Sequence, residues 1–553
     1  MSAGPYAVPR HPAPTDLDLA GTELDWRGTA SLQAAEAGRY PDRGLLTRAL
    51  ARRLDVDPSR VLSTAGSDDA LERSFRLLLA PGTEALLATP TFEMLPRFAQ
   101  WAGASVVEVP WPSGHFPVEA FLAQVTPRTR VIAVVSPNNP TGLVASTDAV
   151  AALVAGAPET TVIVDLAYVE FADRDPTPEL LSLPRVLVTR TFSKAWGLPG
   201  LRVGYVAGPA ELVGRLRDTT PPYPVAGPSL AAALDALTND SERVVRVVRD
   251  VRASRAALTA TLTTLGVATV PSQGNFVCVD DGRAEWLRDG LAGLGIATRW
   301  CAGADRPRLR ITVPLEAAQQ TRLDAALRTV LRPEALLFDM DGVLVDVSAS
   351  YRAAIVGTAA RYGVAVPSGA VQEVKRRGNA NDDWVLTARL LADAGHPVAL
   401  AEVTAVFESL YQGGDGTPGL RERERPLVTR ALLERLAARL PLGVVTGRPR
   451  ADAHRFLERE GIADLFRVVV TRDDGPPKPD PFPVCEALGC LGVARAWMVG
   501  DTPDDARAAR TASVLPLGII APGDDPVATG AALLAAGAGR NLASLDDLLE
   551  LLP

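Results

Sequence analysis

Hydrophobic residues along this chain alternate between helix-like and strand-like spacing. From residue 45 onward, the pattern predicts helices at 45–54, 70–79 and 93–103 and short apolar strands at 61–64, 85–89 and 105–109. Strands that are separated by helices form parallel-rich sheets, and the carboxyl ends of those strands gather polar residues at one edge. The pattern therefore predicts an α/β fold whose functional residues follow strand ends.

A second series of apolar strands begins at residue 335, just after a predicted helix at 323–331. Only Arg332, Pro333 and Glu334 separate the two, and so short a linker indicates domains that are packed rather than loosely tethered. The stretch that follows the first strand of this series reads as helices, which predicts a helical cap. We expect the following units: an N-terminal arm at 1–15, a domain at 16–331, and a domain at 335–553 whose cap spans about 347–428.

Composition narrows the class of protein. The net charge is −8, which opposes a nucleic-acid partner because a phosphate backbone requires a basic face. Four cysteines in 553 residues are too sparse for a disulfide framework and fit a reducing cytoplasm. No secretion signal or membrane-spanning apolar run is evident. We expect a multidomain cytoplasmic protein with no membrane partner.

One lysine is flanked by residues that can bind an anion. Thr191 and Ser193 precede Lys194, and Arg202 follows it, directly after a short strand at 186–189. Hydroxyls and a guanidinium grip a phosphate while an amine bonds an aldehyde, and pyridoxal 5′-phosphate (PLP) carries both groups. The alternative is a solvated lysine in a loop rich in glycine and proline.

Other strand ends extend this constellation. Asp165 ends an apolar strand, where a carboxylate is costly unless a cation such as a protonated pyridine nitrogen meets it. Asn139 ends another strand and, together with Tyr168, can hold the oxygen on the ring. Phe92 can stack on the ring or pack in the core. Residues 66–69 open a helix whose N-terminus can hold a phosphate or simply be capped.

Residues 16–331 resemble fold type I PLP aminotransferases, specifically the histidinol-phosphate aminotransferase group. The matching stretches, in the family's order, are RYPD, AGSDDA, PTFEM, SPNNPTG, VDLAYVEF, TRTFSKAWGLPGLRVGY, GNFV and RLRITVP. The resemblance implies a small C-terminal subdomain and a homodimer. It also implies roles for single residues: Lys194 bonds the cofactor and moves the proton, Asp165 holds the pyridine nitrogen, Asn139 and Tyr168 hold the ring oxygen, Phe92 stacks on the ring, Ser67, Asp68, Thr191, Ser193 and Arg202 bind the cofactor phosphate, Arg310 binds the substrate carboxylate or phosphate, and Tyr40 reaches the cofactor phosphate of the neighbouring subunit.

The N-terminal region departs from that family. Its usual motif, rich in asparagine and glutamate, helps to close the substrate site. Here the region reads DLDLAGTELDWRG, and no asparagine precedes Asn138. Glu23 is the candidate substitute, and the amino substrate is less well defined than the cofactor site.

Acidic residues dominate the strand ends of the second series. Asp339 and Asp341 follow its first strand, and two such carboxylates repel each other unless a cation such as Mg²⁺ lies between them. Thr446 ends a later strand and Lys478 lies between prolines, where each can hold a phosphoryl oxygen. Asp501 and Asp505 follow a further strand end. Taken singly, these residues are also compatible with a plain turn, a solvated lysine and exposed helix caps.

Together, these features resemble the haloacid dehalogenase-like (HAD) hydrolases over residues 335–553. The resemblance implies that Asp339 is the nucleophile, that Asp341 is the general acid and then the base, that Thr446 and Lys478 anchor the phosphoryl group, and that Asp339, Asp341, Asp501 and Asp505 surround Mg²⁺. Because an alkoxide leaving group needs a proton and a halide does not, Asp341 favours a phosphatase over a dehalogenase. Arg376, Arg377, Asn379 and Asp383 either line the cap or form a solvated helix start.

The two resemblances predict a bifunctional enzyme. We expect transamination of a phosphorylated ketone with an amino donor such as glutamate, followed by hydrolysis of a phosphate monoester. Imidazole acetol phosphate and histidinol phosphate, consecutive compounds of histidine biosynthesis, are the best candidates. The alternatives are a specialised-metabolism enzyme acting on another phosphorylated keto or amino compound, a PLP decarboxylase, and a HAD domain with a binding role only.

Overall fold

The structure is a computed structural model that describes residues 9–24, 40–303, 306–367, 369–378, 382–414 and 417–553. These residues fall into two compact units. The first unit runs over 19–284 and 298–321, and the second over 10–18, 285–297 and 322–553. The predicted arm at 1–15 lies partly outside the described residues, and residues 10–18 group with the second unit.

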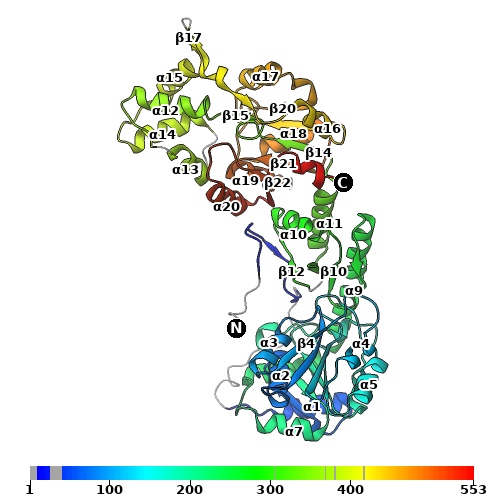
Figure 1. Ribbon diagram of the computed structural model, residues 1–553. Helices are drawn as coiled ribbons and strands as arrows, with labels where there is room; N and C mark the ends of the chain where they lie inside the picture. The colour runs from blue at the N-terminus through cyan, green and yellow to red at the C-terminus, as the bar shows by residue number, and fades with distance from the viewer. Residues whose placement is uncertain (1–8, 25–39, 304–305, 368, 379–381, 415–416) are drawn as a thin grey trace. The chain divides into compact units, whose positions relative to one another are not determined.

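The first unit is built on a seven-stranded sheet, visible in Figure 1 with helices on both sides. Its strands are, in spatial order, β2 (Val61–Thr64), β8 (Gly204–Ala207), β7 (Val186–Thr191), β6 (Thr161–Asp165), β5 (Thr129–Val135), β3 (Glu84–Thr89) and β4 (Ser105–Pro110). All neighbouring pairs are parallel except those that β8 makes with β2 and β7. The predicted α/β class and parallel-rich sheet are confirmed.

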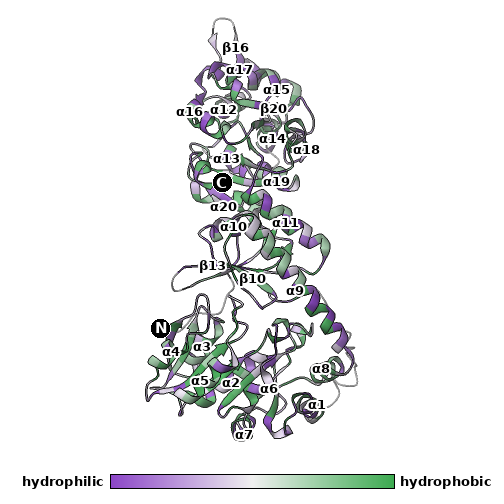
Figure 2. Cartoon of the chain, turned by 90° about the vertical axis from the view of Figure 1, so that its right-hand side faces the viewer, coloured by the Kyte–Doolittle hydropathy of each residue, from purple (hydrophilic) through white to green (hydrophobic). Residues whose placement is uncertain are grey.

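The helices of the first unit pack on its sheets and on one another, and they bury the apolar residues of the strands. They are α1 (Gly44–Leu54), α2 (Ser67–Leu78), α3 (Met94–Trp101), α4 (Val118–Ala123), α5 (Thr147–Gly156), α6 (Thr177–Ser182), α7 (Ala210–Asp218), α8 (Gly227–Asn239) and α9 (Ser241–Thr264). In α9, Val244, Val251 and Leu258 are buried at helical spacing, while Figure 2 shows hydrophilic residues along the same helix. Because the apolar residues recur on one face of α9, the helix can pack against the unit although most of its residues are polar.

A second, smaller sheet completes the first unit. Its antiparallel strands are β12 (Arg299–Cys301), β13 (Arg308–Thr312), β10 (Phe276–Val279) and β9 (Thr269–Val270). Every residue of β10 and β13 is buried. This sheet places Arg310 in the interior of the unit.

The second unit is built on a six-stranded sheet in which all pairs are parallel. The strands are, in spatial order, β20 (Phe466–Val470), β19 (Leu442–Val445), β14 (Ala335–Phe338), β21 (Ala496–Gly500), β22 (Leu515–Ile519) and β23 (Arg540–Leu542). The helices that accompany it are α16 (Arg430–Ala437), α17 (Arg450–Arg459), α18 (Phe482–Leu491), α19 (Pro503–Thr511), α20 (Pro526–Ala536) and α21 (Asp547–Leu551). Central strand β14 ends immediately before Asp339.

A helical insertion follows β14, as predicted, and Figure 1 shows its helices together. They are α12 (Tyr351–Arg361), α13 (Ala370–Arg377), α14 (Asp383–Asp393) and α15 (Leu400–Gln412). The chain enters this cap along β15 (Val345–Asp346) and returns along β18 (Arg425–Pro426), and the two strands pair antiparallel. The two crossings are therefore tied to each other.

The second unit also contains segments that precede β14 in the sequence. They are β1 (Leu17–Asp18), the body of α10 (Ala284–Gly293), β11 (Ile296–Ala297) and the last turns of α11 (Ala317–Leu331). Trp497 of β21 is fully buried, donates to the carbonyl of Thr329 at 2.8 Å, and packs against Trp286 with ring centres 5.0 Å apart. In the part of the chain that the structure describes, no helix combines the length and the apolar character needed to cross a membrane.

Candidate active sites

Lys194 lies in the turn that follows β7, where the sequence predicts covalent chemistry. Its Nζ donates a hydrogen bond to Thr22 Oγ1 and lies 5.6 Å from the centre of the Tyr168 ring. The hydroxyl of Tyr168 donates to the same Thr22 oxygen at 3.2 Å. The amine is thus held between the N-terminal segment and the residues that follow β6.

Asp165 is the last residue of β6 and is 4% exposed. It accepts a hydrogen bond from Thr189 Oγ1 at 2.8 Å. Burial raises the pKa of Asp165 to about 7 and the charge of Asp68 adds to this, whereas the Thr189 hydrogen bond and the charge of Lys194 lower it. A cation placed against this carboxylate would stabilise its charged form, so the residue fits the protonated ring nitrogen of the predicted cofactor.

The predicted phosphate ligands, namely Ser67, Asp68, Thr191, Ser193 and Arg202, meet at the N-terminus of α2. Thr191 donates to the Ser193 hydroxyl at 2.9 Å, and Arg202 donates to that hydroxyl at 3.2 Å and to Asp68 at 3.1 Å. Gly66, with φ +86°, precedes the helix, and a Cβ there would lie 2.7 Å from the Arg202 guanidinium. Hydroxyls, a guanidinium and the free N–H groups of a helix start together form an anion site.

Arg310 reaches the same region from β13. It donates to Asn139 Oδ1 and to the carbonyl of Ala20, both at 2.6 Å, and its guanidinium lies 5.3 Å from the centre of the Phe276 ring. The side chain is buried, and its Nε has no hydrogen-bond partner among the described residues. Because Asn139 accepts through Oδ1, its amide nitrogen is left to donate.

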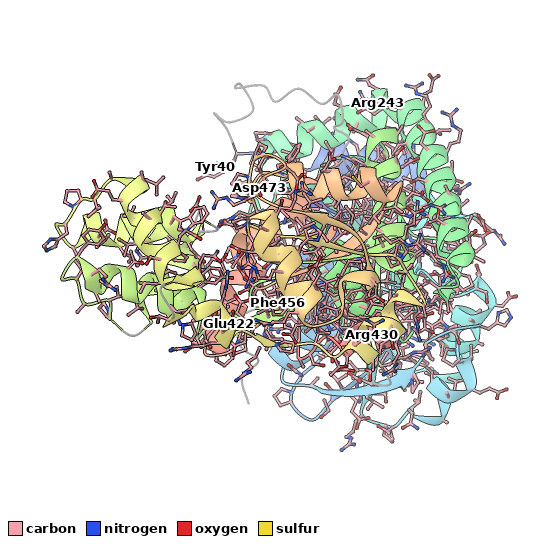
Figure 3. All side chains as sticks on the ribbon, turned by 90° about the horizontal axis from the view of Figure 1, so that it is seen from above. Tyr40, Arg243, Glu422, Arg430, Phe456 and Asp473 are labelled. Carbon is pink, nitrogen blue, oxygen red and sulfur yellow. The ribbon has the colours of Figure 1, made fainter. Side chains whose placement is uncertain are left out.

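Three other residues singled out from the sequence lie differently. Phe92 is half-buried and packs against the core of the first unit. Tyr40, which Figure 3 labels, is 81% exposed and stacks on Tyr223 with ring centres 4.4 Å apart. Glu23 is exposed. The role predicted for Tyr40 needs a second subunit.

The sequence reasoning missed Thr22. This threonine is buried and holds both Lys194 and Tyr168, and its carbonyl accepts from Asn275 at 3.0 Å. A single threonine in an irregular segment carries no spacing signal, so only the tertiary structure reveals it.

Three carboxylates converge in the second unit. Asp339 follows β14, Asp501 follows β21, and Asp505 lies in the first turn of α19; one oxygen from each lies within 4.8 Å of the others, and all three are buried. Lys478 Nζ lies 2.5 Å from Asp339 Oδ1, also contacts Asp505, and donates to the carbonyl of Val445 at 3.1 Å. The lysine thus bridges two of the three carboxylates.

Burial dominates the electrostatics of this acid site. It raises the pKa of Asp339 and of Asp501, and the neighbouring carboxylates raise both further, while Lys478 lowers that of Asp339. Burial alone would lower the pKa of Lys478, but Asp339 and Asp505 outweigh it and raise the value. Three clustered carboxylates offer the oxygen ligands that Mg²⁺ prefers, so the donor set fits this ion.

Asp341 stands apart from this cluster, although the sequence predicts it as a fourth metal ligand. Its Oδ1 accepts from Arg448 Nε at 2.6 Å. Thr446 comes directly after β19 and is buried, and its hydroxyl accepts from the backbone N–H of Arg448 at 3.2 Å. Arg448 was not among the residues identified from the sequence.

The cap contributes a different cation from those expected. Lys375 of α13 lies 3.0 Å from Asp383, and burial opposes the charge of this lysine while Asp383, Asp501 and Asp341 raise its pKa. Arg376 and Arg377 instead pair with Glu373 on the same helix. Asn379 lies outside the described residues.

Comparison with known families matches both units. The profile of the family described as aminotransferase class I and II matches residues 22–327, and that of the haloacid dehalogenase-like hydrolases matches residues 333–513. The described residues 285–297 and 322–327 therefore fall within the aminotransferase match while packing in the second compact unit.

Individual relatives match different shares of the chain. Histidinol-phosphate aminotransferase 2 of Pseudomonas fluorescens (strain Pf0-1) is 36% identical over 305 residues, which cover 54% of this chain and 82% of that protein. An imidazoleglycerol-phosphate dehydratase of Phytophthora nicotianae is 46% identical over 237 residues, or 40% of this chain, and the chain spans about half (52%) of its length.

A solved structure agrees with these matches. The histidinol-phosphate aminotransferase of Sinorhizobium meliloti in complex with pyridoxal-5′-phosphate superimposes with a TM-score of 0.54 at 27% identity, covering 58% of this chain and 92% of that one. Both resemblances predicted from the sequence are confirmed. The chain belongs to the aminotransferase class I and II family, and its aminotransferase domain is followed by a haloacid dehalogenase-like hydrolase domain.

Proposed function

We propose that this protein is a bifunctional enzyme that transaminates a phosphorylated ketone and hydrolyses a phosphate monoester. The best candidates are conversion of imidazole acetol phosphate to histidinol phosphate and removal of phosphate from histidinol phosphate. The observation that carries the first half is the buried Asp165 beside Lys194 and an anion cradle, in a chain similar to proteins named histidinol-phosphate aminotransferases.

PLP, which the structural relative binds, fits the first site. When bound, it supplies an electron sink for the bond changes at the substrate α-carbon. The residues of the chain would have separate tasks: Asp165 would hold the ring nitrogen, the anion site around Ser193 and Arg202 would hold the phosphate, and Asn139 and Tyr168 would hold the ring oxygen. Lys194 Nζ would move a proton at the substrate α-carbon, and Phe92 would cover the ring.

Arg310 is the proposed anchor for the substrate. Its planar guanidinium suits a carboxylate or a phosphate, and it is positioned by the Ala20 carbonyl and Asn139. We propose a homodimer in the cytoplasm, in which Tyr40 of each subunit reaches the neighbouring cofactor phosphate. The exposed position of Tyr40 supports this role.

In the second site, Asp339 attacks phosphorus, Thr446 and Lys478 hold the phosphoryl oxygens, and Asp341 serves as general acid and then as base. Mg²⁺, held by Asp339, Asp501 and Asp505, supplies charge neutralisation when bound. The observation that carries this assignment is the convergence of three buried carboxylates with one lysine at the ends of neighbouring strands.

The relative named imidazoleglycerol-phosphate dehydratase supports the choice of substrate. Loss of water from a glycerol side chain gives an enol that becomes a ketone, so the reaction in that protein's name would yield a phosphorylated imidazole ketone. A ketone of this kind is the substrate proposed for the lysine site. The three reaction classes would then follow one another.

The test is to incubate the protein with PLP, Mg²⁺, histidinol phosphate and 2-oxoglutarate and to follow glutamate and inorganic phosphate separately. Asp339→Asn should lose phosphate release and keep glutamate formation, while Lys194→Ala should do the reverse. The absence of turnover in both channels would reject these substrates, and loss of both activities in either variant would contradict two independent sites.

A further inference from the structure

Arg448 is a buried cation of the second unit to which the proposed function gives no role. It follows Thr446 in the loop after β19, and its side chain is 1% exposed. Its Nε donates to Asp341 at 2.6 Å, while its two terminal nitrogens form a fork on Glu424 at 2.9 and 3.2 Å. One guanidinium therefore joins the proposed general acid to a second carboxylate.

Aromatic rings enclose this guanidinium and fix its plane. Its carbon lies 4.9 Å from the centre of the Tyr351 ring and 5.8 Å from that of Phe456, which Figure 3 labels on α17. A guanidinium that contacts two aromatic rings and is forked onto a carboxylate has little freedom to reorient. Nε is consequently aimed at Asp341 by the surrounding structure rather than by Asp341 itself.

Glu424 connects this arrangement to the cap. It is 4% exposed and lies on the return crossing just before β18, where it also accepts from Ser350 at 3.2 Å and from Tyr411 at 3.0 Å. Ser350 lies at the entry to the cap and Tyr411 near the end of α15. Both cap crossings are thus fastened to the arginine that holds Asp341.

We propose that Arg448 is a positioning residue that fixes one oxygen of Asp341 so that the other faces the leaving group, with Glu424 aligning Arg448 when the cap is in place. This inference rests on the proposed phosphatase function. The first step breaks the bond between phosphorus and the ester oxygen as Asp339 attacks, and Asp341 gives its proton to that oxygen. In the second step Asp341 takes a proton from water, whose oxygen bonds phosphorus and releases Asp339 and inorganic phosphate.

The dependence on leaving group separates positioning from general damage to the site. An alkyl phosphate such as histidinol phosphate needs the proton from Asp341, whereas 4-nitrophenyl phosphate has a stable leaving anion and does not. In single-turnover experiments with Arg448→Gln, we expect alcohol release from the alkyl ester to slow by about a hundredfold, within the usual worth of general acid catalysis. The rapid first release of 4-nitrophenol should keep nearly its wild-type rate.

A second variant keeps the inference testable if Arg448→Gln does not fold, because that change leaves Glu424 buried without its cation. Glu424→Gln preserves the shape of the side chain and its contacts with Ser350 and Tyr411. It should also slow cleavage of the alkyl ester selectively, but by a smaller factor than Arg448→Gln. Arg540→Gln is the matched control. In the same unit but outside the site, Arg540 donates a hydrogen bond to Asp289 at 2.8 Å and forms an ion pair with it at 2.7 Å. This variant should leave both esters unaffected.

Equal slowing of both esters in the Arg448 and Glu424 variants would overturn the inference and make Arg448 a structural residue. Unchanged or faster alkyl ester cleavage would overturn it as well, because Asp341 would then not depend on Arg448. If the wild type cleaved neither ester, the proposed phosphatase function itself would fail, and the inference with it.

Discussion

In the lysine site, buried Asp165 accepts a hydrogen bond from the neutral hydroxyl of Thr189, while the nearby amine of Lys194 binds Thr22 instead. In the acid site, Lys478 directly contacts two of the buried carboxylates. The first site therefore leaves the charge of its carboxylate to be balanced by a bound cofactor, whereas the second carries a permanent cation. Removal of the lysine charge should destabilise the acid site, whereas removal of the Asp165 charge should stabilise the lysine site.

The largest effect is expected from Lys478→Met. Asp339 and Asp505 would face each other with no ammonium between them, and removing one partner of a buried ion pair typically costs about 3–5 kcal/mol. Thermal unfolding of the second unit should shift down accordingly, and phosphate release should disappear. Glutamate formation below the unfolding temperature serves as the control, and a fully stable variant would show that the lysine is not needed to balance the carboxylates.

Asp165→Asn should instead stabilise the cofactor-free protein. The carboxyl has a pKa of about 7 when folded and about 3.9 when unfolded, so its ionisation opposes folding as pH rises between these values. The gain from asparagine should be near zero at pH 4, grow by up to about 1.4 kcal/mol per pH unit, and level off near about 4 kcal/mol above pH 7. Unfolding of both proteins across this pH range measures the difference.

Two results would speak against this reading of Asp165. If the two proteins differed in unfolding free energy by the same amount at all pH values, burial would not raise the pKa of the Asp165 carboxyl. A wild type that is more stable than Asp165→Asn at pH 8 would mean that a cation of the protein already balances it.

Mg²⁺ should affect only the acid site. At a concentration one hundred times its dissociation constant, a ligand that binds the folded state alone adds about 2.7 kcal/mol. We expect a matching upward shift in the unfolding of the wild type, and little shift in Asp501→Asn, which loses one of the three carboxylates. Calorimetry with and without EDTA measures it, and an equal shift in both proteins would place the ion elsewhere.

Five of the residues that the sequence identified share one property. Asp165, Thr191, Asp339, Thr446 and Asp501 each come at or directly after the end of a buried strand, as the alternation of apolar and polar residues indicates. Parallel strands end at one edge of the sheet, so their positions in three dimensions follow from the pattern. The fold class and several strands of the two parallel-rich sheets, among them β2, β3, β4 and β14, could be predicted for the same reason.

The residues that the sequence missed lack that property. Thr22 lies in an irregular segment, Arg448 lies two residues beyond a motif threonine, and Lys375 stands beside two arginines of equal charge on α13. Each owes its position to partners far away in the chain: Thr22 to Lys194, Arg448 to Asp341 and Glu424, and Lys375 to the charges of the acid site. Interactions between residues so far apart in the sequence produce no local sequence pattern, so they cannot be predicted from the sequence alone.

The smallest effect is expected from a substitution of Thr22, which tests the lysine site directly. Thr22→Val keeps the shape of the side chain but removes the oxygen that accepts from Lys194 and Tyr168. A net hydrogen bond contributes about 1 kcal/mol, so kcat for glutamate formation should fall roughly fivefold to tenfold. Thr22→Ser should restore the rate, because serine provides the same acceptor. If Thr22→Val retained the full rate, the orientation of Lys194 would be fixed by its own loop and the bound cofactor, and the Thr22 hydroxyl would have no part in catalysis at the lysine site.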